Sequence, residues 1–446
     1  MIQGLRNALR VPEIRNKLIF TALILVIYQF IAHVPVIGVD RTNLQQTLNS
    51  EIAGGLINTL NLLSGGAVAN FSVIANGVYP YITASIIFQL LVPVIPQLEA
   101  IQREPGGREK IQRYTYYLAI PMAVLQSIGQ IQIFNILGAD AAGNPIQIIP
   151  GFGSDWLLTA TVLITMTAGT MLAIWLGELI TEQGIGNGIS IIIFSGIVAN
   201  APSQLWNLLV NSGTSAFRIY NVILFLVVTL FSLVVIIFVQ EGIRRVPVQY
   251  GKRVRGSRQY GGQTSYIPMK VNPVGMIPLI FAQSIITFPA ILVSLLPASD
   301  FTTNITQTFG QQTGWAYWIT FFFLTVGFTF FYSDVMIQQQ NLSENLQRNN
   351  GYIPGIRPGK NTEDYITRVT RRITVVGALF LGLIAVLPGI INGLNSVIFQ
   401  GIATSQVNAA VVITGSGLII VVGVVVDTLR QVEAQLMMRS YEGFMR

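Results

Sequence analysis

The sequence of 446 residues contains no cysteine, a single histidine and few charged side chains. Without cysteine, a disulfide framework, thiol chemistry and a cysteine-ligated metal site are all excluded. Charged residues make up 10 % of the chain and hydrophobic residues 52 %, whereas soluble domains carry about 25 % charged residues. This composition is typical of a polytopic helical membrane protein.

Charge-free runs that can hold the roughly 20 apolar residues of a membrane span recur along the chain. The clearest are Leu18–Val39, Tyr114–Ala139, Trp156–Gly177, Ile219–Gln240, Val271–Ser299 and Phe301–Ser333. Gln183–Phe217 holds one further span. Ile373–Val426 is long enough for two, and we expect the turn between them at Pro388-Gly389 and Asn392-Gly393. Met1–Lys17 lacks the features of a cleavable signal, so the first span is expected to direct insertion.

The stretch Ile52–Leu98 is ambiguous because its first half is rich in asparagine, serine and glycine. If it holds one full span preceded by a half-inserted segment, the total is ten spans. All 26 lysines and arginines except Arg41 and Arg218 then fall on one side, as the positive-inside rule requires. We therefore predict ten transmembrane helices with both termini in the cytoplasm. For the half-inserted segment, a surface helix on the outer leaflet remains the alternative.

Two stretches of the chain have nearly the same amino-acid sequence. Gly77–Ile87 and Gly275–Ile286 both open with Gly-x-x-Pro-x-Ile-x-Ala and continue with serine and an isoleucine pair. In the predicted topology these spans cross the membrane in opposite directions, which is the signature of an inverted repeat in transporters and channels. We predict an all-α fold in two pseudo-symmetric halves of five spans, residues 1–210 and residues 211–446.

Charged side chains are missing from the span interiors, although they are the usual functional sites of pumps and coupled transporters. A proton- or sodium-coupled carrier would have to rely on backbone carbonyls alone. An ion-coupled secondary transporter for small solutes, built on an inverted repeat, is therefore the second hypothesis. His33, the only histidine, is expected near the outer end of the first span and has no intramembrane partner for nucleophilic catalysis. We expect no enzyme, no cofactor and no metal site.

The glycine-rich segment Gly184–Gly188 is not followed by the lysine of a phosphate-binding loop, so we expect it to mark close helix packing. Branched aliphatic residues recur at helical spacing in three spans: Val78, Ile82 and Ile86; Ile277 and Ile280; Ile189 and Ile193. A ring of such side chains can gate a passive pore by repelling water. Ordinary packing is the alternative for any single isoleucine.

Polar side chains in the same spans indicate seams between helices. They are Thr83, Ser85, Gln89, Gln126, Ser127, Gln283 and Ser284. Simple interhelical hydrogen bonding, at about 1 kcal/mol each, is the alternative role.

Two predicted cytoplasmic loops, Glu241–Lys270 and Gln338–Arg372, are larger than connectors need to be. Alternating residues around Val246–Arg255 indicate a short hairpin, and prolines and glycines around Arg357 indicate a rigid turn. Their basic side chains could bind ribosomal RNA phosphates or an acidic protein. Setting the membrane orientation is the alternative role of this charge.

Several sequence motifs, found in the order in which the family has them, resemble the SecY/SEC61-alpha family over almost the whole chain. They are Leu63-Ser-Gly-Gly66, Pro80-Tyr-Ile-Thr-Ala-Ser-Ile86, Trp175-Leu-Gly-Glu178, Gly184-Ile-Gly-Asn-Gly-Ile-Ser-Ile-Ile-Ile-Phe194 and Tyr352-Ile-Pro-Gly-Ile-Arg-Pro-Gly359. Members of this family form the central channel of the bacterial Sec protein translocase. The chain departs from many relatives at Asn70, where they carry a basic residue.

The resemblance implies an hourglass channel that passes unfolded secretory polypeptides and releases transmembrane segments sideways into lipid. The pore ring would be Val78, Ile82, Ile86, Ile189, Ile193, Ile277, Ile280 and Ile420. A re-entrant plug helix at about residues 62–74 would include Leu63, Ser64, Gly65, Gly66 and Phe71. The lateral gate would contain the seven polar residues named above.

The resemblance also implies partners. SecA or the ribosome would drive the passive pore by docking on Arg244, Arg245, Lys252, Arg253, Arg255, Arg258, Arg357 and Lys360. SecE and SecG would be membrane subunits, and signal peptides, nascent chains and membrane lipid would meet the gate. A YidC-type insertase and SecDF complete the expected partners, and the bacterial cytoplasmic (inner) membrane is the expected location.

Overall fold

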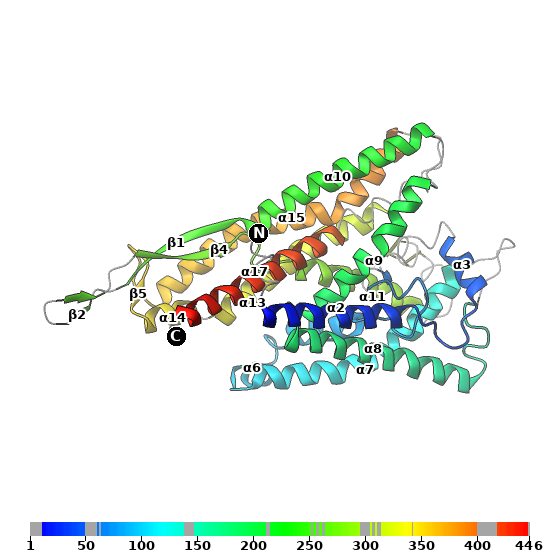
Figure 1. Ribbon diagram of the computed structural model, residues 1–446, viewed down its shortest axis with the longest axis horizontal. Helices are drawn as coiled ribbons and strands as arrows, with labels where there is room; N and C mark the ends of the chain where they lie inside the picture. Colours follow the sequence, from blue (N-terminus) through cyan, green and yellow to red (C-terminus); the bar gives the residue numbers. More distant parts are fainter. Residues whose placement is uncertain are drawn as a thin grey trace.

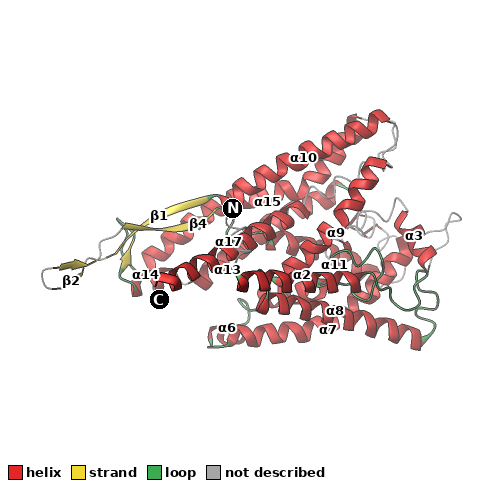
Figure 2. Cartoon of the chain, viewed as in Figure 1, coloured by secondary structure: helices red, strands yellow, loops and turns green. Residues whose placement is uncertain are grey.

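The computed structural model describes residues 11–49, 60–61, 64–137, 147–210, 215–250, 253–255, 258–260, 264–294, 304–305, 308–309, 314–340, 342–398 and 417–444. Most helices run along the long axis of the molecule, and a small β-sheet with a projecting hairpin stands at one end (Figure 1 and Figure 2). We call this the sheet end. The opposite end, where α3 (Arg41–Asn49) lies, is called the loop end.

Helices lie at each place where the sequence predicts a span. They are α2 (Pro12–Ala32), α5 (Tyr79–Leu91), α7 (Gly107–Leu137), α8 (Trp156–Gln183), α9 (Gly188–Val210), α10 (Ser215–Glu241), α11 (Ile277–Ser294), α13 (Trp315–Gln340), α15 (Lys360–Ile398) and α17 (Leu418–Phe444). Among the described residues, 6 helices are long and apolar enough to cross a membrane. A seventh span is formed if α5 is joined to α6 (Pro96–Arg103) across a bend of 106°. The chain is a helical, multi-pass membrane protein, and this count is consistent with ten spans.

One predicted turn is wrong. α15 continues through Pro388-Gly389 and Asn392-Gly393 to Ile398. The glycines there are needed for packing, because a Cβ at position 389 would lie 2.4 Å from the Trp318 ring of α13. Small residues at a membrane helix interface allow such close approach.

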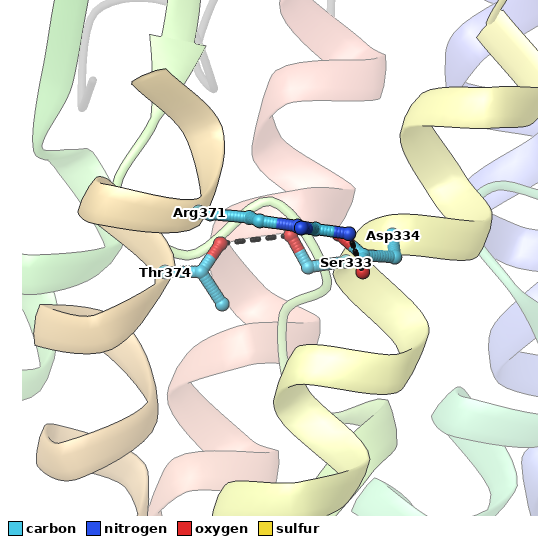
Figure 3. A network of polar contacts seen from close by, with 4 residues as sticks. All are labelled: Ser333, Asp334, Arg371 and Thr374. Carbon is cyan, nitrogen blue, oxygen red and sulfur yellow. Dashed lines mark hydrogen bonds and ion pairs between the residues drawn. The ribbon is translucent and has the colours of Figure 1, made fainter. Parts of the chain in front are cut away.

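α13 and α15 are also joined by polar contacts at the sheet end (Figure 3). The Arg371 Nη2 atom lies 3.0 Å from the Asp334 Oδ2 atom. One turn further along α15, the buried hydroxyls of Thr374 and Ser333 lie 2.8 Å apart. α13 and α15 therefore contact each other in two ways. The Trp318 ring packs against Gly389 within the span, and Arg371 pairs with Asp334 at the sheet end.

The described part of the plug segment is also not the helix that was predicted. Residues 64–78 form mostly turns, with an isolated antiparallel bridge between Ser72 and Pro35, and the described helical residues beside them are Leu60 and Asn61. Side chains satisfy the backbone here in place of helical bonds: Ser64 Oγ accepts from Val68 N and Asn61 Oδ1 from Ala69 N. Serine and asparagine compete with helical hydrogen bonding in this way.

The helices pack into two groups. α2, α8 and α9 contact one another, α8 also contacts α7, and α7 contacts α5. On the other side α11 contacts α13, α13 contacts α15, and α10 contacts α17. The groups meet where α11 lies against α5 and α7 and where α9 lies against α10 and α17. This arrangement is consistent with the two predicted halves.

The sheet end confirms the predicted hairpin. β1 (Ile243–Tyr250) pairs antiparallel with β4 (Thr264–Lys270) and with β5 (Gly351–Tyr352), while β2 (Arg253–Arg255) pairs with β3 (Arg258–Tyr260). Val246, Val248 and Met269 form a small core with residues of α14 (Leu342–Arg348) and α15. The two large basic loops therefore fold into one unit.

Candidate functional site

The two repeated motifs, Gly77–Ile87 and Gly275–Ile286, adopt the same local backbone geometry. Gly77 and Gly275 both have positive φ, 53° and 67°, and each is followed two residues later by the first residue of a helix, α5 or α11. Positive φ is readily available only to glycine. Proline follows at the second helical position, where its missing N–H costs nothing. α11 begins seven residues after the last residue of β4 and runs away from the sheet end (Figure 1).

The eight predicted pore-ring residues belong to one large apolar cluster that extends through the helix bundle. Val78, Ile82, Ile86, Ile193, Ile280 and Ile420 are buried in it, and Ile189 and Ile277 pack against it half-buried. They come from α5, α9, α11, α17 and the cap of α5. Spacing within a single helix predicts a stripe, but it cannot predict that stripes from distant helices meet. The structure places all eight in one apolar core, which also includes buried residues of most of the other helices.

The plug segment lies in the same cluster. Ala67, Val68, Phe71 and Ile74 are each at most 1 % exposed. Phe71 adopts φ of 43°, and its ring meets Phe134 of α7 edge-on at 5.4 Å. A bulky residue with positive φ is strained, and such strain persists only where the surroundings impose it.

Backbone and side-chain contacts fix this segment to α2 and α9. Tyr28 Oη donates to the Ser64 carbonyl at 2.6 Å, and Asn70 Nδ2 donates to the Ala32 carbonyl at 3.3 Å. A Cβ at position 196 of α9 would lie 2.0 Å from Gly65 Cα. Ser64, Gly65, Gly66 and Phe71 lie in this segment, and Leu63 lies outside the described residues.

α5 and α11 meet directly along what we call the seam. Tyr79 Oη on α5 donates to the Ser284 carbonyl on α11 at 2.8 Å, and both residues are buried. Beside it, Gly129 of α7 leaves room for Ile291 of α11, since a Cβ there would lie 2.4 Å from Ile291 Cγ2. Sequence reasoning missed Tyr79, although its place in the repeated phrase was a usable signal.

Most of the predicted gate residues lie beside this seam. Gln126 Nε2 on α7 donates to Thr83 Oγ1 on α5 at 3.2 Å, and Gln283 Nε2 on α11 donates to Tyr317 Oη on α13 at 3.2 Å. Ser127 Oγ accepts a 2.7 Å bond from Asn76 Nδ2, just before α5. Each of these bonds joins residues on one side of the seam. Tyr79 instead links the two sides.

The remaining gate residues have bonds within their own helices, and Gln89 of α5 also makes a side-chain hydrogen bond with Tyr332 of α13. Gln89 Nε2 donates to Ser85 Oγ at 2.8 Å within α5, and Ser284 Oγ donates to the Ile280 carbonyl within α11. Gly184–Gly188 has the predicted packing role, because a Cβ at position 188 would lie 1.8 Å from the Gly177 carbonyl oxygen.

The predicted docking residues gather at the sheet end. Arg244 and Arg245 on β1 and Arg357 and Lys360 before and at the start of α15 are exposed. Arg253, Arg255 and Arg258 lie on the projecting β2–β3 hairpin (Figure 2). Lys252 lies outside the described residues.

One junction at this end carries interacting charges. Arg430 Nη2 on α17 lies 3.0 Å from Glu241 Oε1 at the end of α10. Partial burial and the nearby Arg430 lower the pKa of Lys270 at the end of β4, and Asp427 and Glu241 oppose that shift. The charges of the sheet end therefore border the helix bundle without entering the apolar cluster.

Chemically, the cluster offers branched aliphatic walls, and polar contacts such as the bond from Tyr79 to Ser284 join the two helix groups along the seam. Groups of acidic or histidine side chains that could hold a metal ion are not found among the described residues. His33 is exposed, and its Nδ1 lies 2.7 Å from the Gln29 carbonyl of its own helix. The arrangement suits a passage that is sealed by packing and opened by separating helices.

Sequence comparison decides the family. A model of the SecY family matches residues 72–429. The chain belongs to the SecY family. It is 40 % identical over 453 residues to the protein translocase subunit SecY of Streptomyces galbus, covering 100 % of both chains. Identity is 40 % over 458 residues to the SecY of Halalkalibacterium halodurans, again with 100 % of both covered.

Solved SecY-family structures share the fold. A protein-conducting channel matches with a TM-score of 0.62 at 18 % identity, covering 93 % of this chain and 91 % of that one. Sec61 from a canine ribosome–channel complex of the endoplasmic reticulum gives 0.61 at 18 %, with the same coverage. A SecY whose plug domain stabilises the closed channel and maintains the membrane seal also gives 0.61, at 17 %.

Proposed function

We propose that this chain is the channel-forming subunit of a protein translocase, through which unfolded polypeptides cross a membrane. The observation that supports the proposal is that the eight proposed pore-ring residues and the plug segment belong to the same uncharged apolar core. Branched aliphatic side chains repel water and provide no ligand field for an ion. We call the narrow part of the channel lined by the pore ring the waist. Such a waist can seal around a polypeptide of any sequence.

The seam gives this channel a lateral exit. α5 and α11 belong to different helix groups and share one direct side-chain hydrogen bond, Tyr79 to Ser284. Separating the groups would open the cluster toward lipid, so that signal peptides and transmembrane segments of nascent chains could leave sideways. The halves that part would be residues 1–210 and residues 211–446.

The exposed arginines and lysines of the sheet end are proposed to dock an external motor, because the passage has no energy source of its own. SecA and the ribosome are the proposed drivers, SecE and SecG the proposed membrane subunits, and YidC-type insertases and SecDF further partners. The sheet end would face the cytoplasm of a bacterial cell. The ion-coupled transporter hypothesis is not favoured by the family or by the uncharged cluster.

Crosslinking tests the passage. The chain has no cysteine, so a photoreactive probe on a cysteine at Ile82 or Ile280 reports on one position. A stalled secretory polypeptide should crosslink at both, whereas a probe at Ile223, exposed on the outside of α10, should give no adduct. The absence of adducts at both Ile82 and Ile280 contradicts the proposal.

The docking surface is tested separately by Arg357→Glu, which reverses charge on an exposed turn outside the membrane cluster. SecA-driven transport into vesicles should fall while the folded chain and its complex remain intact. Glu363→Lys, a charge change at an exposed site in the first turn of α15, is the matched control. Equal transport by wild type and Arg357→Glu shows that this charge serves only orientation.

A further inference from the structure

A small cavity lies in the seam between α5, α7 and α11. Asn76 and Tyr79 line it on the α5 side, Gln126 and Gln130 on α7, and Ile291 on α11. It offers about 10 Å³ of space for the centre of a water molecule. A single buried water needs about that much space.

Two unpaired acceptors belong to residues that line this cavity. Gln126 and Gln130 are 2 % and 4 % exposed, and the Oε1 atom of each is buried without a hydrogen-bond partner. The two residues are four apart on α7, so their side chains lie on the same face of the helix. Buried carboxamide oxygens in native proteins are almost always paired, either with protein or with ordered water.

We propose that this cavity binds one ordered water molecule, which donates one hydrogen to Gln126 Oε1 and the other to Gln130 Oε1. Water is the ligand that fits, because the space admits nothing larger and the lone oxygens require a donor. The direct donors nearby are already engaged: Tyr79 Oη donates to Ser284, and Asn76 Nδ2 donates to Ala123 and Ser127.

The site belongs to the closed seam. Ile291 of α11 closes one wall of the cavity and the other named lining residues come from the opposite helix group. Parting the seam would open the cavity to its surroundings and release the water. A ligand that binds one state better shifts the equilibrium toward that state. This part of the inference rests on the proposed function, in which the seam opens.

A double-substitution cycle tests the shared water. Leucine replaces Gln126, Gln130 or both in the full chain within its purified complex. Spin labels on cysteines at Ile120 and Ile319, exposed on α7 and α13, report the open fraction of the seam. If one water donates to both oxygens, replacing either glutamine displaces the water and leaves the oxygen of the other glutamine without a donor. The effects of the two substitutions are then coupled. We expect the double variant to differ by about fivefold from the product of the single effects.

Gln89→Leu is the matched control, because Gln89 Oε1 is also buried and unpaired but Gln89 does not line this cavity. It lies ten residues beyond Tyr79, about 15 Å along α5, and should combine with Gln130→Leu multiplicatively. The bond from Gln126 to Thr83 is lost both in Gln126→Leu and in the double variant. Its contribution therefore cancels from the coupling between the two substitutions.

Multiplicative effects for Gln126 and Gln130 overturn the shared water. A density map that resolves ordered water should also show a peak within hydrogen-bond distance of both oxygens, and an empty cavity at that resolution overturns the site outright. The map tests the site whether or not the chain transports protein, so failure of the site and failure of the proposed function can be told apart.

Discussion

The Tyr79 hydroxyl gives the sharpest test of the seam. Its bond to the Ser284 carbonyl is 2.8 Å long, buried, and the direct side-chain link that we identify between α5 and α11. Tyr79→Phe removes only the hydroxyl and keeps the ring that packs in the apolar cluster. The change therefore isolates one hydrogen bond from the surrounding packing.

The expected size follows from the bond. A neutral buried hydrogen bond contributes about 1 kcal/mol, and interhelical bonds in membranes average somewhat less, about 0.6 kcal/mol. A loss of about 1 kcal/mol multiplies the ratio of open to closed seam about fivefold, since about 1.4 kcal/mol corresponds to tenfold. The Ser284 carbonyl remains within α11, so leaving it without the hydroxyl adds little further cost.

Spin labels at Ile120 and Ile319 measure this ratio in the reconstituted complex. Tyr116→Phe is the matched control, because the Tyr116 hydroxyl bonds Glu178 between α7 and α8, within one helix group. It should leave the open fraction unchanged. If Tyr79→Phe leaves the distance distribution as it is in the wild type, the hydroxyl does not hold the seam and the reasoning is refuted.

The remaining predictions concern the waist, the plug segment and one helix cap. Serine at Ile82, Ile193 and Ile280 should hydrate the waist and raise resting ion conductance in planar bilayers; unchanged conductance would place these side chains outside the pathway. Gly196→Ala puts a methyl group into the plug backbone and should also raise resting conductance, while Gly327→Ala on α13, with open space around its Cα, should not. Hydrogen bonds from Thr42 lower the pKa of Asp40 at the start of α3. Protonation therefore removes this cap as pH falls through the lowered pKa, so the amide protection factors of α3, which correct for the intrinsic exchange rate at each pH, should fall in acid. Asp40→Asn should abolish that pH dependence.

Much of the architecture could be predicted from the sequence because its signals are local. Apolar runs predict helices wherever about 20 such residues occur together, and α2, α7, α8 and α10 lie where they were expected. The repeated Gly-x-x-Pro phrase predicted two equivalent helix starts, and Gly77 and Gly275 confirm it through their positive φ.

The two errors arose where local signals compete with packing. Pro388-Gly389 is typical of a turn, but α15 continues through it, and Gly389 serves instead to let the Trp318 ring of α13 pack closely. The plug segment was predicted to be helical, but its serine and asparagine side chains satisfy the backbone in turns. At Gly389 the deciding contact comes from another helix, whereas in the plug segment the local serine and asparagine bonds outweigh helix formation.

The sequence by itself determined that the chain spans a membrane many times, carries no charge in its span interiors, and contains two copies of one helix start. These follow from side-chain chemistry and helical spacing. Only the tertiary structure decided which apolar stripes share a cluster, that Tyr79 reaches Ser284, and that Gln126 and Gln130 line one cavity. The reason is physical: a hydrophobic residue specifies burial but no partner, and partners are chosen when whole helices pack.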